Sequence, residues 1–157
     1  MIITTHAVVG AAVTNLLKFN PPLALGTALA SHFLLDILPH YDYQLESLSK
    51  TSDSSNLKLD YRLWFKDIRK LGLDFSSAFI LVLFFWPPPT SSYLVYLGAG
   101  LAILPDGLHF LDHLMNWRIT NIFTSFHQFF HTSWRLNSPI WGLFWQILIV
   151  LTVLIFN

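Results

Sequence analysis

The sequence predicts an all-α integral membrane helical bundle of about five segments with a cytoplasmic interfacial helix. The first observation is composition, since 54% of the 157 residues are hydrophobic and 11% are charged, whereas about a quarter of an ordinary soluble domain is charged. The second is that residues 75–105 and 136–157 contain no Asp, Glu, Lys, Arg or His, and both stretches exceed the roughly 20 residues that span a bilayer. We therefore expect one integral membrane domain over residues 1–157.

Composition also excludes several classes of function. The formal net charge is zero, so the electrostatic footprint of a nucleic-acid-binding protein is missing. The chain has no cysteine, which excludes disulfides, thiolate metal sites and cysteine nucleophiles. A bound metal would have to be held by His, Asp or Glu.

Prolines set most of the expected helix boundaries. Pro21 suits the first turn of a helix and Pro39 its end, and three prolines at 87–89 divide the long apolar stretch into two helices. The N-terminal apolar stretch is shorter and its insertion depth is left open, and it lacks the basic flank and cleavage pattern of a signal peptide. We expect apolar helices over about 4–18, 21–38, 72–86, 92–114 and 136–157.

A polar insertion of about 43–71 separates the second and third apolar helices. Apolar residues recur in its second half at intervals of three and four, as in an amphipathic helix. They are Leu57, Tyr61, Trp64, Phe65, Ile68 and Leu71. This helix would lie in the membrane interface or pack on the cytoplasmic face of the protein itself, and the pattern does not separate the two.

Basic residues predict the orientation. Five crossings place eight of the nine Lys and Arg residues on one side, in the 43–71 and 115–138 connections, and leave Lys18 alone on the other. Loops rich in Lys and Arg tend to remain cytoplasmic. We expect the N-terminus inside and the C-terminus outside.

Most His and Asp residues then fall at the cytoplasmic ends of the helices, where ionisable groups are costly unless they are paired, hydrated or functional. Three elements carry such residues three, four or seven positions apart, the spacing that shares one helix face. These sets are His32 and Asp36; Asp106, His109 and His113; and His127 and His131. Imidazole and carboxylate together suit zinc, iron or manganese. For any single pair, a hydrogen-bonded histidine near a helix end is the competing explanation.

Some candidates have equally good structural explanations. His6 follows two threonines that would cap a helix, and Asp74 would cap the third apolar helix. His40 and Asp42 follow the helix-ending proline and are second-tier candidates.

Several motifs resemble those of a family of small bacterial multi-pass proteins, the predicted membrane-bound metal-dependent hydrolases. The matching segments are Thr5-His6, the run from Ser31 to Asp36, Leu104-Pro105-Asp106-Gly107-Leu108-His109, and His127 to Ser133. Leu108 stands where the family has a second Asp, an Arg-Gly turn is absent, and the order of the motifs differs. The resemblance implies a bacterial inner-membrane protein with a metal site formed by His6, His32, Asp36, Asp106, His109, His127 and His131.

The resulting hypothesis is a hydrolase that binds one or two divalent ions, of which zinc is favoured, on the cytoplasmic side. The ion would lower the pKa of a bound water, with Asp74 or His113 as general base. A looser similarity to zinc-dependent phospholipase C suggests a lipid phosphoester as substrate, which would enter from the bilayer. Two alternatives stay open, a membrane di-iron oxygenase and a non-enzymatic metal carrier.

Overall fold

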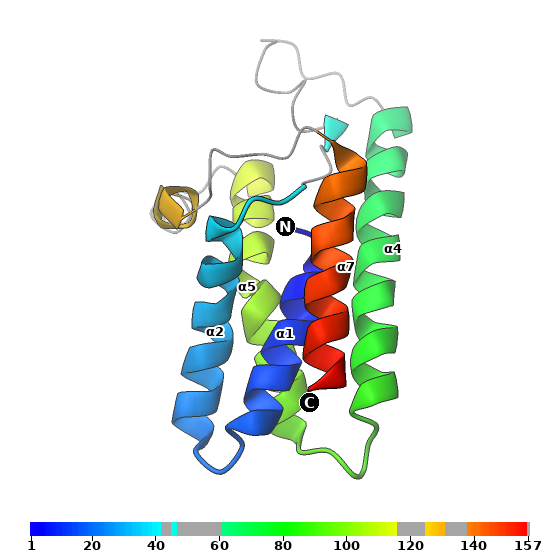
Figure 1. The fold of residues 1–157 in the computed structure, drawn as a ribbon. Helices are drawn as coiled ribbons and strands as arrows, with labels where there is room; N and C mark the ends of the chain where they lie inside the picture. The colour runs from blue at the N-terminus through cyan, green and yellow to red at the C-terminus, as the bar shows by residue number, and fades with distance from the viewer. Residues whose placement is uncertain (42–44, 47–60, 116–124, 131–137, 157) are drawn as a thin grey trace.

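The computed structural model describes residues 1–41, 45–46, 61–115, 125–130 and 138–156, without the side chains of 112–115. This part of the chain is all-α and contains no strand. A further short helical stretch covers residues 125–130. The longer helices are α1 (Ile3–Leu16), α2 (Pro21–Ile37), α4 (Tyr61–Phe85), α5 (Tyr93–Met115) and α7 (Pro139–Ile155), which run alternately up and down the bundle (Figure 1).

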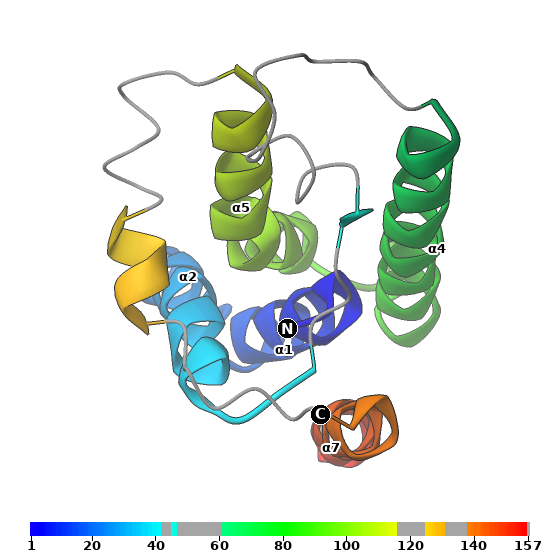
Figure 2. The ribbon, with the colours of Figure 1, turned by 90° about the horizontal axis from the view of Figure 1, so that it is seen from above.

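Helix α1 lies at the centre of the bundle. It packs against α2, α4, α5 and α7, which surround it when the molecule is viewed along the bundle (Figure 2). Its central residues are mostly small, from Ala7 to Ala12, and nearly all of them are buried. Small side chains on every face let several neighbours approach one helix, so this sequence suits the central position.

The closest helix pair, α1 and α5, depends on two glycines. A Cβ on Gly10 would lie 2.8 Å from the carbonyl oxygen of Gly98, and a Cβ on Gly98 would collide with the side chain of Thr14. The Thr14 hydroxyl donates to the Gly10 carbonyl at 2.7 Å and so is satisfied within its own helix. The absence of side chains at these two positions allows the backbones to approach.

Most expected boundaries are confirmed, and they have local causes. Asn20 caps α2 by accepting a hydrogen bond from the Leu23 amide at 3.3 Å, and Pro21 occupies the first helical turn. The prolines at 87–89 lie between α4 and α5, as predicted. Pro139 likewise begins α7.

One expected boundary is wrong. The amphipathic helix and the third apolar helix form the single helix α4, with no break near residue 71. Gly72 has open space around it and continues the helix. The apolar residues Tyr61, Phe65 and Ile68 of the expected interfacial face are exposed, and Leu57 lies outside the described residues.

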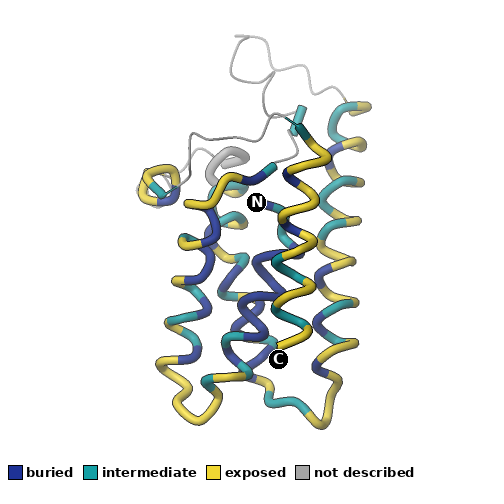
Figure 3. Tube along the Cα trace, viewed as in Figure 1, coloured by how far each residue is buried: buried dark blue, intermediate teal, exposed yellow. Residues whose placement is uncertain are grey.

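The outside of the bundle is strongly apolar. Large exposed apolar side chains cover the outer faces of α4 and α7, including Phe79, Phe84, Trp141 and Leu151. Buried residues concentrate on α1 and on the faces turned toward it (Figure 3). Among the described helices, the stretch Tyr93–Leu111 alone is both long and apolar enough to cross a membrane by length and composition.

Candidate metal centre

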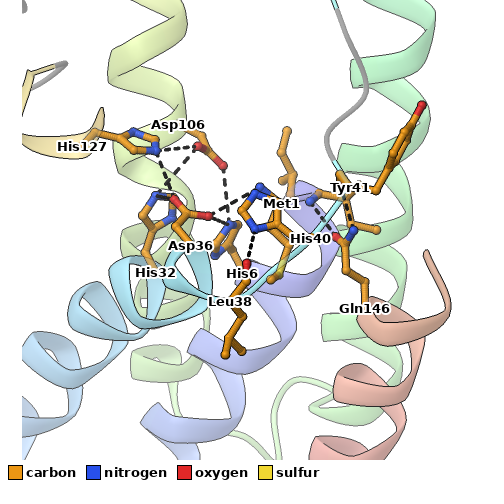
Figure 4. A network of polar contacts seen from close by, with 12 residues as sticks. Met1, His6, His32, Asp36, Leu38, His40, Tyr41, Asp106, His127 and Gln146 are labelled. Carbon is orange, nitrogen blue, oxygen red and sulfur yellow. Dashed lines mark hydrogen bonds and ion pairs between the residues drawn. The ribbon is translucent and has the colours of Figure 1, made fainter. Parts of the chain in front are cut away.

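Residues from four separate elements meet at one end of the bundle (Figure 4). His6 comes from the first turns of α1, His32 and Asp36 from the end of α2, Asp106 from α5, and His127 from the 125–130 helix. Four of them form a group whose ligand atoms all lie within 4.8 Å of one another. We call His32, Asp36, Asp106 and His127 the His–Asp cluster. The predicted convergence of these four residues is therefore confirmed.

Asp36 is at the centre of the His–Asp cluster. Its Oδ2 lies 3.1 Å from Nε2 of His32 and 3.1 Å from Nε2 of His127. Its Oδ1 lies 3.3 Å from Nε2 of His6. The Asp36 carboxylate is thus in contact with three imidazoles, and each imidazole approaches it through its Nε2 atom.

Asp106 faces the same three imidazoles from the other side. Its oxygens lie 3.8 Å from Nε2 of His32, 3.7 Å from Nε2 of His127 and 3.9 Å from Nε2 of His6. These separations exceed hydrogen-bond lengths. Each of the three Nε2 atoms therefore has an oxygen of both carboxylates within 4 Å, a grouping of donors that suits a common cation.

Burial makes these carboxylates costly unless positive charge compensates them, and the N-terminal ammonium of Met1, 3.5 Å from Oδ1 of Asp36, supplies part of that charge. The side chains of His6, His32 and Asp36 are 0% exposed, and that of Asp106 is 25% exposed. Two carboxylates held together in a buried place need positive charge or several hydrogen bonds. The partial exposure of Asp106 marks the side from which the cluster is accessible.

Both ring nitrogens of His6 and Nε2 of His32 lack a well-formed hydrogen bond. Within the described part of the chain, these three atoms are buried and make no contact with hydrogen-bond geometry, although Asp36 is close to the two Nε2 atoms. Such buried groups are rare, and each needs an explanation. A metal ion bound by the two Nε2 atoms would satisfy those two nitrogens.

The backbone of α5 fixes the orientation of His32. Its Nδ1 lies 2.8 Å from the carbonyl oxygen of Ala102, and because that oxygen can only accept, Nδ1 carries the proton. Pro105, inside α5, has no N–H and interrupts the hydrogen bonding of that helix nearby. The lone pair of Nε2 is then left for the cluster, as in histidines that bind metals.

His127 is less enclosed than the other two imidazoles. Burial lowers its pKa, but the hydrogen bond to Asp36 and the negative charges of Asp106 and Asp36 outweigh burial, so its pKa is raised above the ordinary value. The aromatic ring of Phe33 lies 6.4 Å from the ring of His127, centre to centre, and packs on Phe126 and Phe130 at 5.3 and 5.2 Å. These contacts hold the 125–130 helix against α2.

The residues present fit a divalent ion. The donors are imidazole nitrogens and carboxylate oxygens, which are ligands of zinc, iron and manganese. His6, stacked on His32 with ring centres 4.2 Å apart, would either bind the ion or hold Asp36 in place. The donor set does not discriminate among these metals.

Other predicted site residues have different positions. Asp74 accepts hydrogen bonds from the amides of Ile3 and Thr4 at 2.8 and 2.9 Å, and from the Thr4 hydroxyl at 2.6 Å. It therefore caps α1 rather than its own helix. His109 adjoins the cluster, with its ring centre 5.6 Å from that of His127. The side chain of His113 and the whole of His131 lie outside the described residues, as does Asp42.

One buried polar residue near the cluster, Gln146, was not identified by sequence reasoning, and His40 was only a second-tier candidate. Gln146 of α7 is 1% exposed, accepts a hydrogen bond from the Ile2 amide at 2.9 Å and donates one to the Tyr41 carbonyl at 2.9 Å. His40 is also buried, and its Nδ1 donates to the Leu38 carbonyl at 2.7 Å. The sequence signal that could have identified Gln146 is its position as a lone glutamine within an apolar helix.

Comparison of the chain with protein-family models, with curated proteins and with solved structures found no match. The geometry of the cluster and the motifs in the sequence are therefore the guides to function.

Proposed function

We propose that the protein is a membrane-embedded, metal-dependent hydrolase that acts on a lipid or another amphipathic phosphoester. The observation that carries the proposal is the convergence of three imidazole Nε2 atoms on two carboxylates in a buried place. A divalent ion held there would supply Lewis acidity and would lower the pKa of a coordinated water. The resemblance to the metal-dependent hydrolase family supports the same reaction class.

The residues have distinct roles in this proposal. Asp36, His32 and His127 hold the ion, and the Ala102 carbonyl keeps His32 in the required tautomer. Asp106 also binds the ion and lies at the accessible edge, where water and substrate arrive. Asp74 is fully engaged in capping α1, so we assign it to positioning His6 instead of to proton transfer.

A bilayer is the proposed environment because of the outer surface. Phe84 is 76% exposed, Ile140 78% and Phe129 83%, and they belong to a surface that carries large apolar residues on several helices. So many large apolar side chains exposed on several helices are typical of a protein surrounded by lipid. The inner membrane of a bacterium, with the cluster on the cytoplasmic side, is the location that the distribution of basic residues favours.

Hydrolysis of vesicle lipids tests this function. Purified protein would be reconstituted into phospholipid vesicles, loaded with zinc, and assayed by mass spectrometry for released headgroups and diacylglycerol. We expect turnover that stops with a chelator and with Asp106→Asn, and that persists with Glu46→Gln, whose carboxylate pairs with lysines away from the cluster. Turnover insensitive to both the chelator and Asp106→Asn would refute the proposal, as would iron content with oxo-bridged absorption in place of zinc-dependent hydrolysis.

A further inference from the structure

An apolar groove lies between α4 and α5. These two helices both pack on α1 but make little direct contact with each other, and Figure 2 shows them diverging on one side of α1. Side chains of all three helices line a cavity of about 330 Å³, within the range of small-molecule sites. Its wall includes Ala7 of α1, Phe75 and Phe79 of α4, and Ile103 of α5.

The chemistry of the groove excludes polar ligands. Its lining residues among those that the structure describes are apolar except Tyr96, whose hydroxyl donates to the carbonyl oxygen of Trp86 at 2.5 Å. None of these described lining residues is charged. A hydrocarbon is the ligand class that such a wall accepts without leaving polar groups unpaired.

One end of the groove lies within one helical turn of metal-centre residues along both α1 and α5. Ala7 of the groove follows His6 along α1, and Ile103 precedes Asp106 by one turn of α5. From Ile103 the groove extends along α5 to Tyr96, which at 1.5 Å per residue is about 10 Å. Phe75 and Phe79 are both more than half exposed, so the groove is open along the side that would face lipid.

We infer that this groove holds a hydrocarbon chain of the lipid whose phosphate reaches the His–Asp cluster. The inference rests on the proposed function, because it supplies the binding site for the tail of that substrate. One end of the groove lies at the depth of the cluster, and the other is bounded by Pro88 and Tyr96. A tail lying between α4 and α5 would hold the headgroup end near Asp106.

Photolabelling in a bilayer tests the groove directly. The full chain is reconstituted into phosphatidylcholine vesicles that contain a phosphatidylcholine with a diazirine on one acyl chain, illuminated, and mapped by mass spectrometry. We expect label to concentrate on Phe79, Leu83 and Tyr96 relative to the exposed Trp141 and Phe144 of α7. Equal labelling of both sets would show annular lipid only and would overturn the inference.

Substitutions that place a side chain in the groove can be compared with the same kind of substitution outside it. Gly100 lines the groove and Gly26 of α2 does not, and a Cβ at either position meets nothing within 4 Å. We expect Gly100→Ala and Gly100→Leu to lower groove labelling progressively, several-fold for the larger side chain, whereas Gly26→Leu leaves it unchanged. Labelling that persists in both Gly100 variants would overturn the inference.

The same vesicle preparations test the tail site and the metal-dependent hydrolase function independently of each other. Labelling is measured before and after chelation, and bound metal is measured separately. Groove labelling in a protein that binds no metal would refute the hydrolase function while the tail site remains. Stoichiometric metal without preferential groove labelling would refute the tail site alone.

Discussion

Nε2 of His127 lies 3.1 Å from Oδ2 of Asp36, across 91 positions of the sequence. This contact joins the 125–130 helix to the end of α2 and completes the His–Asp cluster. The carboxylate accepts the hydrogen bond while Nε2 of His32 approaches the same oxygen. The metal centre therefore depends on correct packing of distant segments as well as on the ligands themselves.

Removing His127 should weaken metal binding with little effect on the rest of the bundle. His127→Ala deletes one donor at the accessible side of the cluster, and we expect zinc affinity to fall by more than about 10-fold, the smallest loss typical when a residue that only hydrogen-bonds to a metal ligand is removed. Isothermal titration of the metal-free protein in detergent measures this change. Gln128→Ala, on the exposed side of the same short helix, is the control, and an equal loss in both variants would contradict the assignment.

Asp74→Ala should lower stability and leave the metal ligands in place. The Asp74 carboxylate satisfies two amides at the start of α1, and loss of a helix cap costs about 0.5–2 kcal/mol. Thermal unfolding in detergent should therefore begin at a lower temperature, while the folded protein keeps its zinc. Abolished hydrolysis with unchanged stability would instead support the general-base role that the sequence suggested.

Several features of the fold follow from local sequence, and others require the tertiary structure. Pro21 and the prolines at 87–89 mark helix boundaries because proline lacks an N–H and fixes its own backbone angle. The i, i+4 spacing of His32 and Asp36 places both side chains on one helix face. These predictions needed no knowledge of the packing.

The partners of Asp74 and Gln146 could not be read from the sequence, because they come from segments about 70 and 144 residues away. The continuity of α4 was also missed. A change from polar to apolar composition near Leu71 resembles a boundary, but Gly72 is compatible with a helix and no proline interrupts it. Composition predicts environment better than it predicts helix ends.

Gln146→Leu should destabilise the bundle despite the greater hydrophobicity of leucine. The substitution leaves the Ile2 amide and the Tyr41 carbonyl without their side-chain partner, and an unsatisfied buried group costs about 1–3 kcal/mol. Denaturation in mixed micelles compares this variant with Gln128→Leu, which changes an exposed glutamine. A more stable Gln146→Leu protein would show that these hydrogen bonds contribute nothing.

Gly98→Val should separate α1 from α5. Its side chain would collide with Thr14, and overpacking of this kind costs about 1–3 kcal/mol or more. Gly26→Val introduces the same side chain into open space on α2 and controls for the intrinsic helix preference of valine. We expect a lower unfolding temperature for Gly98→Val than for Gly26→Val, and equal temperatures would contradict the close α1–α5 approach.

Metal binding should weaken on acidification. Imidazoles bind metals in the neutral form, and the pKa of His127 is raised above the ordinary value of about 6.5, so protons begin to compete with the ion above that pH and compete more strongly below it. Titrations at a series of pH values should show affinity rising with pH and then reaching a plateau. Affinity independent of pH between about 5.5 and 8 would exclude imidazole ligands.

The metal content of the purified protein tests the central claim most directly. Protein extracted into mild detergent without chelator would be measured by inductively coupled plasma mass spectrometry, together with Asp36→Ala and Glu46→Gln. Because Asp36 contacts three imidazoles, we expect at least one equivalent of a transition metal, zinc above all, in the wild type and Glu46→Gln, and almost none in Asp36→Ala. A wild-type protein that remains metal-free after incubation with zinc, or an Asp36→Ala protein that retains its full complement, would contradict the account.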